Sequence, residues 1–192
     1  MTSALSLRLN ALGLLALTLV LALAFADQLL FGDLPCPLCL LQRAGFVAAA
    51  LGLVLNLTCG VRPSHYGLMI LGAVFGGLIS LRQVALHVVP GSGSYGSAFL
   101  ELHFYTWALV VFTLIVAGSA IMLLFDRQFA PAAAPGSTRR PLLATLALAA
   151  FAAVVALNAL STLAECGVGL CPDNPTTYEL LQGAKLGAGP VK

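Results

Sequence analysis

The sequence predicts an all-α integral membrane protein, and three observations support this fold class. Hydrophobic residues make up 60% of the 192 residues and charged residues only 8%, against roughly 45–50% and about 25% in soluble domains. The mean hydropathy is +1.01. The chain also contains five apolar runs of about the 20 residues that a helix needs to cross a bilayer. This composition excludes a soluble enzyme, a disordered chain and a nucleic-acid-binding protein.

The predicted membrane-spanning helices cover residues 11–31, 40–57, 66–89, 104–125 and 142–163. None of the runs alternates with the period of two that a barrel strand would show. We expect a single membrane domain over residues 1–192, with the tail 164–192 outside the bilayer. The longest connection, residues 126–140, is rich in Ala, Pro, Gly and Ser and is typical of a flexible loop.

The first apolar run has a second interpretation. Arg8, the run itself and the small-residue segment Ala24-Phe25-Ala26 also resemble a signal peptide with a cleavage site. A membrane-spanning helix is favoured, because residues 29–31 extend the apolar run past Asp27 to spanning length. Cleavage would leave the orientation of the other four helices unchanged.

The distribution of charges predicts how the helices are oriented. If the helices alternate in direction, one side carries Arg8, Arg62, Arg127, Arg139 and Arg140. The other side carries Asp27, Asp33, Glu101, Glu165, Asp173 and Glu179, with Lys185 and Lys192 only in the distal tail. Arginine and lysine favour the cytoplasmic side, so we expect a cytoplasmic N-terminus and an exported C-terminal tail.

Four of the five cysteines meet on the exported side in this topology. Cys36 and Cys39 lie at the start of the second helix, and Cys166 and Cys171 lie just beyond the fifth. Disulfides persist in an oxidising compartment, so two redox pairs are possible. Cys59 ends the second helix about 27–30 Å from Cys39, at 1.5 Å per residue, and is expected to be a reduced, inert thiol.

The setting of the first pair favours redox chemistry over a zinc site, although Cys-x-x-Cys alone is common to both. Pro37 suits the first turn of a helix, which would put Cys36 near the N-cap, where the helix dipole stabilises a thiolate. Arg43 follows Cys39 by four residues and therefore shares its helix face. The alternative for Arg43 is an interfacial anchor whose charge reaches the headgroups.

Arg82 is a second candidate binding residue. It lies inside the third predicted helix, about two turns before Pro90, and charges within a membrane helix are usually functional. Together with Arg43, it predicts a pocket for a polar group beneath the dithiol. Nearby, His87 and His103 flank the loop between the third and fourth helices; either histidine can carry a proton.

The second pair is separated by four residues, two of them glycine, which allow a small disulfide ring. The alternative is a structural disulfide that holds the tail. Beyond this ring, residues 176–179 have capping-box spacing and predict a short helix on the membrane surface. Tyr95, Tyr105 and Trp107 are first of all expected to form an interfacial aromatic belt.

These motifs resemble a known family. Residues 34–43, LPCPLCLLQR, resemble the signature of the DsbB family of quinone-linked thiol oxidases, matched here at Cys36, Cys39 and Arg43. Residues 81–84, LRQV, are similar to the family's third-helix arginine segment and match Arg82. Residues 95–98 (YGSA) and 102–107 (LHFYTW) resemble a version of the family familiar from alpha-proteobacteria.

The resemblance implies a four-helix bundle in the bacterial inner membrane. Such a protein reoxidises a periplasmic, thioredoxin-like partner, DsbA, and passes two electrons to ubiquinone or menaquinone. By this resemblance Cys36 and Cys39 exchange electrons with the membrane quinone, and Arg43 supports the quinone and a thiolate charge-transfer state. A second cysteine pair contacts the partner protein.

The sequence departs from this pattern in the position of the second pair. The family's best-known members carry it between the third and fourth helices, but residues 89–103 contain no cysteine. We infer that Cys166 and Cys171, delivered by a fifth helix, replace it as the shuttle. Three alternatives remain: four thiolates holding zinc or copper, a structural subunit braced by disulfides, and an enzyme of the same fold that serves one dedicated substrate.

Overall fold

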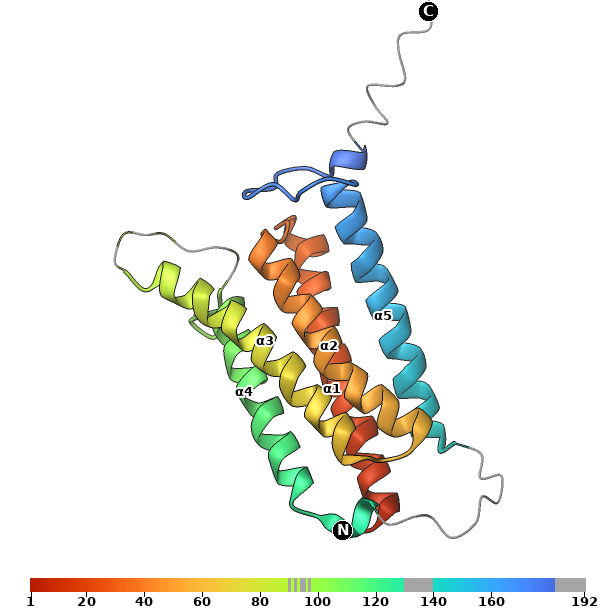
Figure 1. Ribbon diagram of the computed structural model, residues 1–192. Coiled ribbons are helices and arrows are strands. Elements are labelled where there is room, and N and C mark those ends of the chain that lie inside the picture. Colours follow the sequence, from red (N-terminus) through yellow and green to blue (C-terminus); the bar gives the residue numbers. More distant parts are fainter. Residues whose placement is uncertain (90, 92, 94–95, 97, 130–139, 182–192) are drawn as a thin grey trace, which may run out of the picture.

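The computed structural model is built from five long helices (Figure 1). It describes residues 1–89, 91, 93, 96, 98–129 and 140–181. The helices are α1 (Ser3–Phe31), α2 (Pro37–Cys59), α3 (Pro63–His87), α4 (Phe104–Leu123) and α5 (Leu142–Cys166). Each is long and apolar enough to cross a membrane, which confirms the predicted all-α integral membrane fold. The remaining elements are β1 (Ala98–Phe99), β2 (Leu102–His103) and the 3₁₀ turn η1 (Asp126–Phe129).

Four of the helices extend beyond the apolar runs, because hydropathy marks only the lipid-facing length and capping residues determine the ends. α1 begins eight residues before the predicted residue 11, where Thr2 Oγ1 accepts a hydrogen bond from the Leu5 N–H at 3.3 Å. Pro37 and Pro63 open α2 and α3, as proline does at a first turn. α3 and α4 end two residues before the predicted ends.

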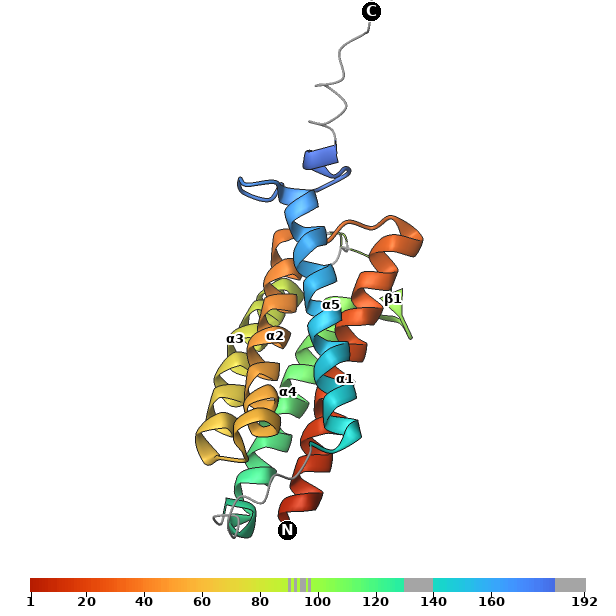
Figure 2. The ribbon, with the colours of Figure 1, turned by 90° about the vertical axis from the view of Figure 1, so that its right-hand side faces the viewer.

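The helices follow one another in an up-and-down arrangement (Figure 1). α1 packs on α2, α2 on α3, and α3 on α4, while α5 lies mainly along α1 (Figure 2). The first four helices thus form a bundle to which α5 adds on one side. Because the directions alternate, the start of α2 and the end of α5 lie at the same end of the molecule (Figure 1). Both cysteine pairs belong to that end, opposite the N-terminus.

Glycines bring α2 and α3 into backbone contact. A Cβ atom on Gly72 would lie 2.5 Å from the Ala49 nitrogen, and one on Gly45 would lie 2.7 Å from the Gly76 Cα. Phe112 of α4 closes this region by stacking on Phe46, with 4.0 Å between ring centroids. Small residues that allow such an approach are a common means of helix association in membranes. The spacing of α2 and α3 is therefore fixed by backbone contact.

A buried polar cluster joins the elements at the end that carries the N-terminus. Asn10 Nδ2 donates to Tyr66 Oη at 2.8 Å, and Asn56 Nδ2 donates to Asn10 Oδ1 at 2.8 Å. Ser6 Oγ donates to Gln128 Oε1 at 2.8 Å. These bonds connect α1, α2, α3 and η1, and they satisfy polar groups that would be costly in hydrocarbon.

Candidate thiol redox site

The first cysteine pair is built into the start of α2. Cys36 is the N-cap residue, and its Sγ accepts a hydrogen bond from the Cys39 N–H at 3.2 Å. Pro37 occupies the first turn, so the predicted N-cap position of Cys36 is confirmed. Both cysteines are free thiols; Cys36 is buried and Cys39 is partly buried. The helix start thus presents two adjacent sulfurs to the interior.

The surroundings of Cys36 favour its thiolate. The hydrogen bond from the Cys39 thiol is the main cause that lowers the pKa of Cys36 to about 7, against burial, which raises it. The Cys39 backbone N–H and the Gln83 side chain lower the pKa further. Donors that bind the charged form of an acid lower its pKa in this way. Cys36 is therefore the thiolate of the pair near neutral pH.

A buried pair of carboxamides lies against the two sulfurs. Gln83 Nε2 of α3 is 3.5 Å from Cys36 Sγ and 3.6 Å from Cys39 Sγ. Gln42 Nε2 of α2 donates to Gln83 Oε1 at 2.7 Å. The sequence analysis did not single out either glutamine. Their position inside apolar helices was the available signal, because polar side chains in such helices usually face the protein interior.

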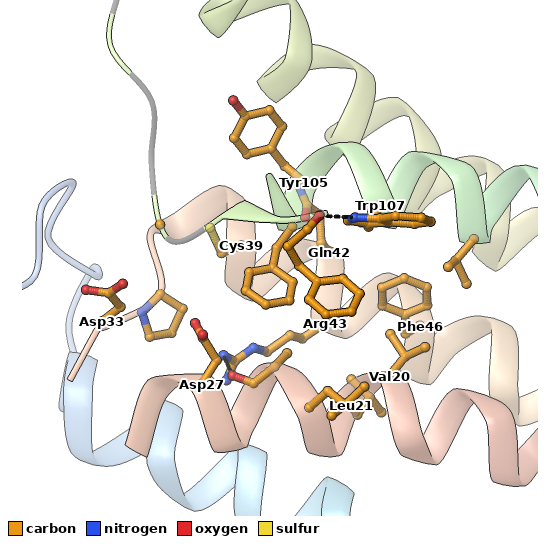
Figure 3. A pocket seen from close by; sticks show the side chains of 18 of the residues that line it. Val20, Leu21, Asp27, Asp33, Cys39, Gln42, Arg43, Phe46, Tyr105 and Trp107 are labelled. Atoms are coloured by element: carbon orange, nitrogen blue, oxygen red, sulfur yellow. Dashed lines mark hydrogen bonds between the residues drawn. The ribbon is translucent and has the colours of Figure 1, made fainter. Parts of the chain in front are cut away.

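A cavity of about 260 Å³ lies beside Cys39 (Figure 3). Its polar part is formed by Cys39, Gln42, Arg43 and acidic residues. The rest of its wall is mainly apolar or aromatic and includes Leu21, Phe46, Phe99, Trp107 and Val111. Trp107 is held in the wall by a hydrogen bond from its Nε1 to the Phe99 carbonyl, at 2.9 Å. The cavity therefore presents one sulfur, one cation, one carboxamide and two acidic side chains within a mainly apolar wall.

Arg43 is fixed by three hydrogen bonds to neighbouring helices. Its Nη1 donates to Gln28 Oε1 at 2.8 Å and to Asn158 Oδ1 at 3.1 Å, and its Nη2 donates to the Ala24 carbonyl at 2.9 Å. Figure 3 shows its side chain pointing toward Asp27, with which it interacts electrostatically. Arg43 is thus a partly buried cation that connects α2 with α1 and α5, and its bonds to protein acceptors argue against the alternative of an interfacial anchor.

The fifth helix takes part in this network. Gln28 Nε2 of α1 donates to Ser161 Oγ of α5 at 2.8 Å and to Tyr178 Oη of the tail at 3.0 Å. Gln28 and Asn158 are both buried. Through Gln28, Arg43 is connected to the segment that follows the second cysteine pair. Sequence analysis missed Gln28, Asn158 and Ser161, although single polar residues in apolar helices were a usable signal.

The second pair forms a disulfide between Cys166 and Cys171. The tip of this ring exposes two apolar side chains, Val168 and Leu170, which are 100% and 97% accessible. The preceding residue, Glu165, is fully buried, and its carboxyl oxygens have no hydrogen-bond partner among the described residues. Glu165 interacts electrostatically with Arg43 and Cys36. A buried carboxyl group thus lies next to the second pair and within electrostatic range of the first.

Of the two predicted cofactor-binding residues, Arg43 lines the cavity and Arg82 does not. The side chain of Arg82 is exposed on α3. The next residue, Gln83, takes the inward position. Consecutive residues of a helix point about 100° apart, so one step along α3 changes which side chain faces the sulfurs. A role for Arg82 in cofactor binding stays a prediction without a contact that supports it.

The other predicted residues lie around the site. Tyr105 stacks between His87 and His103, with ring centroids 5.2 Å and 5.3 Å away. In the tail, residues 179–181 are helical, so this turn begins after the predicted capping position Thr176. Cys59 is an exposed free thiol at the opposite end of α2. Tyr95, Arg139, Lys185 and Lys192 lie outside the described residues.

These features define a class of protein: a multi-pass membrane protein with a buried dithiol at a helix start and a disulfide at the same end. Residues 6–94 match the family model for disulfide bond formation protein DsbB, so this part of the chain is similar to that family. The match, together with the membrane-spanning helices, indicates a membrane protein of disulfide bond formation. No curated protein and no solved structure gives a significant match. The match covers the first pair, Arg43 and Gln83, whereas α5 and the second pair lie beyond it.

Proposed function

We propose that this protein reoxidises a periplasmic, thioredoxin-like dithiol protein of the DsbA type and passes the electrons to a membrane quinone. It would work in the bacterial inner membrane, with its N-terminus in the cytoplasm and both cysteine pairs on the periplasmic face. Residues 1–192 would form one membrane domain. The family match supports the thiol chemistry, and the charge distribution of the loops supports the orientation.

The observation that carries the quinone assignment is the cavity beside Cys39. A quinone has a flat ring, two carbonyl oxygens and an apolar substituent. The aromatic and aliphatic walls suit the ring, Arg43 supplies a cation for a carbonyl oxygen, and the Cys39 sulfur lines the same space. These residues fit ubiquinone or menaquinone. When bound, the quinone would accept two electrons and two protons.

The two pairs divide the thiol chemistry between them. A partner thiolate attacks the Cys166–Cys171 disulfide, and the mixed disulfide is resolved by the partner's second thiol. The reduced pair then attacks the Cys36–Cys39 disulfide and returns to its oxidised state. In the structure the second pair is oxidised and the first is reduced.

Arg43 would hold its charge beside the cavity without moving. Its bonds to Gln28, Asn158 and the Ala24 carbonyl fix the guanidinium before any ligand arrives. Preorganised charge stabilises developing negative charge more effectively than a side chain that must first reorient. α5 therefore contributes to the first site as well as carrying the second pair.

Quinone reduction by the purified protein, supplied with a reduced thioredoxin-like partner, tests this proposal. Wild type is compared with a Cys36→Ser/Cys39→Ser variant, a Cys166→Ser/Cys171→Ser variant and Cys59→Ser as the matched control. We expect activity only in wild type and in Cys59→Ser. If the Cys166→Ser/Cys171→Ser variant keeps full activity, the second pair is structural. If wild type reduces neither ubiquinone nor menaquinone, the quinone assignment fails.

A further inference from the structure

Thiol–disulfide exchange at the first pair requires stabilisation of the sulfur that leaves. A thiolate that leaves more readily speeds the exchange. Arg43 gives its three hydrogen bonds to Gln28, Asn158 and the Ala24 carbonyl. Among the described residues, the side-chain donor that reaches both sulfurs is Gln83, at 3.5 Å from Cys36 Sγ and 3.6 Å from Cys39 Sγ.

Gln42 determines which end of the Gln83 carboxamide faces the sulfurs. An amide has an acceptor oxygen and a donor nitrogen with two hydrogens. Gln42 donates to the Gln83 oxygen at 2.7 Å, so the two N–H groups of Gln83 remain for the sulfurs. Gln42 and Gln83 are 6% and 1% exposed. A rotated amide would leave buried polar groups unpaired, which is costly.

We infer that the Gln83 carboxamide is a catalytic group that donates a hydrogen bond to each sulfur of the first pair as that sulfur leaves as a thiolate. Gln42 is the residue that positions this carboxamide. This inference rests on the proposed function in one respect, namely that the first pair receives electrons from another dithiol. One N–H serves each sulfur, so a single side chain acts in both halves of the exchange. In this respect the amide resembles an oxyanion hole.

The exchange balances as follows. A thiolate of the reduced second pair attacks one sulfur of the Cys36–Cys39 disulfide. An intramolecular S–S bond forms between the two pairs, the Cys36–Cys39 bond breaks, and the other sulfur leaves as a thiolate. The second thiolate of the attacking pair then closes Cys166–Cys171 and releases the remaining sulfur. Two electrons pass to Cys36 and Cys39, and the two protons of the attacking thiols end on them. Gln83 donates to each thiolate as it leaves.

The test uses neither quinone nor partner. In a Cys59→Ser/Cys166→Ser/Cys171→Ser background, the dithiol–disulfide equilibrium of the first pair is measured against a reference dithiol at pH 5.5 and pH 8. The rate of Cys36 alkylation is measured across the same pH range. Gln83→Leu removes the donor, Gln83→Glu keeps the size of the side chain, and Gln42→Leu removes the positioning bond. Gln128→Leu, at a buried glutamine of the other polar cluster, is the matched control.

We expect Gln83→Leu to shift the equilibrium at pH 8 about fivefold toward the disulfide, equivalent to about 20 mV for two electrons. At pH 5.5, where both sulfurs are thiols, the shift should fall below about twofold. In Gln83→Leu the pH midpoint of Cys36 alkylation should rise by about one unit. The rise should be larger in Gln83→Glu and smaller in Gln42→Leu. The other groups near the pair, Arg43, His87 and Glu165, are unchanged in every variant.

Three results would overturn the inference. The first is an unchanged equilibrium and alkylation midpoint in both Gln83 variants. The second is a shift of equal size at pH 5.5 and pH 8, because a packing defect does not depend on the thiolate. The third is the same shift in Gln128→Leu. If Gln83→Leu does not fold, Gln83→Glu decides the outcome. A shift at Gln83 in a protein that fails to reduce quinone would leave this inference in place and refute only the quinone assignment.

Discussion

Replacing Gly45 by alanine should push α2 away from α3. The added Cβ would lie 2.7 Å from the Gly76 Cα, whereas carbon atoms pack at about 3.5–4.0 Å. The neighbouring atom belongs to the backbone, so the helices must separate by about 1 Å. Overpacking of this kind costs about 1–3 kcal/mol, and the better helix propensity of alanine offsets about 1 kcal/mol.

The displacement should also reach the thiol site. Gln42 lies about one turn from Gly45, and its 2.7 Å hydrogen bond to Gln83 spans the same two helices. A separation of about 1 Å would stretch this bond beyond the usual range of about 2.7–3.2 Å. Gly45→Ala should therefore both destabilise the protein and slow the alkylation of Cys36 at neutral pH.

Unfolding by SDS in mixed micelles, followed by circular dichroism, measures the first effect. Gly67→Ala is the matched control, because a Cβ at Gly67 meets nothing within 4 Å. We expect Gly45→Ala to be less stable than Gly67→Ala by about 1–3 kcal/mol. Equal free energies of unfolding would show that the α2–α3 backbone contact is not as close as described.

Three further predictions follow from the site. The rate of Cys36 alkylation in reduced protein should fall as the pH drops through about 7, because its pKa is lowered to about 7 and the reactive thiolate is lost below that pH; a midpoint near 9 would contradict this. Asn158→Leu removes the 3.1 Å bond to Arg43 and should lower the free energy of unfolding by about 0.6–1.7 kcal/mol in SDS titrations; unchanged stability would show that this bond contributes nothing. Val168→Ser/Leu170→Ser removes the two exposed apolar side chains of the Cys166–Cys171 ring and should reduce kcat/KM for the protein partner several-fold but leave reduction by dithiothreitol unchanged; equal effects on both would show that these side chains do not contact the partner.

The spans and the first cysteine pair could be predicted because each depends on local sequence. Hydropathy alone locates five apolar runs. Pro37 fixes the start of α2, and with it the N-cap position of Cys36. Arg43 follows from its helical spacing to Cys39. For the second pair, the spacing allowed the observed ring but did not require it, since closure depends on the backbone path through the glycines.

The partners of these residues could not be predicted in the same way. In a membrane helix the lipid-facing and inward faces are both apolar, so hydropathy does not show how a helix is rotated. Arg82 and Gln83 are neighbours, and only packing decides that the glutamine faces the sulfurs. The bond of Arg43 to Asn158 joins residues 115 apart in sequence, and the bond of Gln28 to Ser161 joins residues 133 apart. Such contacts depend on the whole arrangement of helices.

The polar side chains of α1 also bear on how the protein is assembled during synthesis. Asn10 can form its hydrogen bonds with Asn56 and Tyr66 only after α2 and the start of α3 have been made. Ser6 can bind Gln128 only after η1 has been made. Gln28 reaches Ser161 and Tyr178 only when α5 and the tail have been added. The helix made first is therefore among the last to have its hydrogen bonds satisfied, and a chain truncated before α5 would leave Gln28 Nε2 without either of these acceptors.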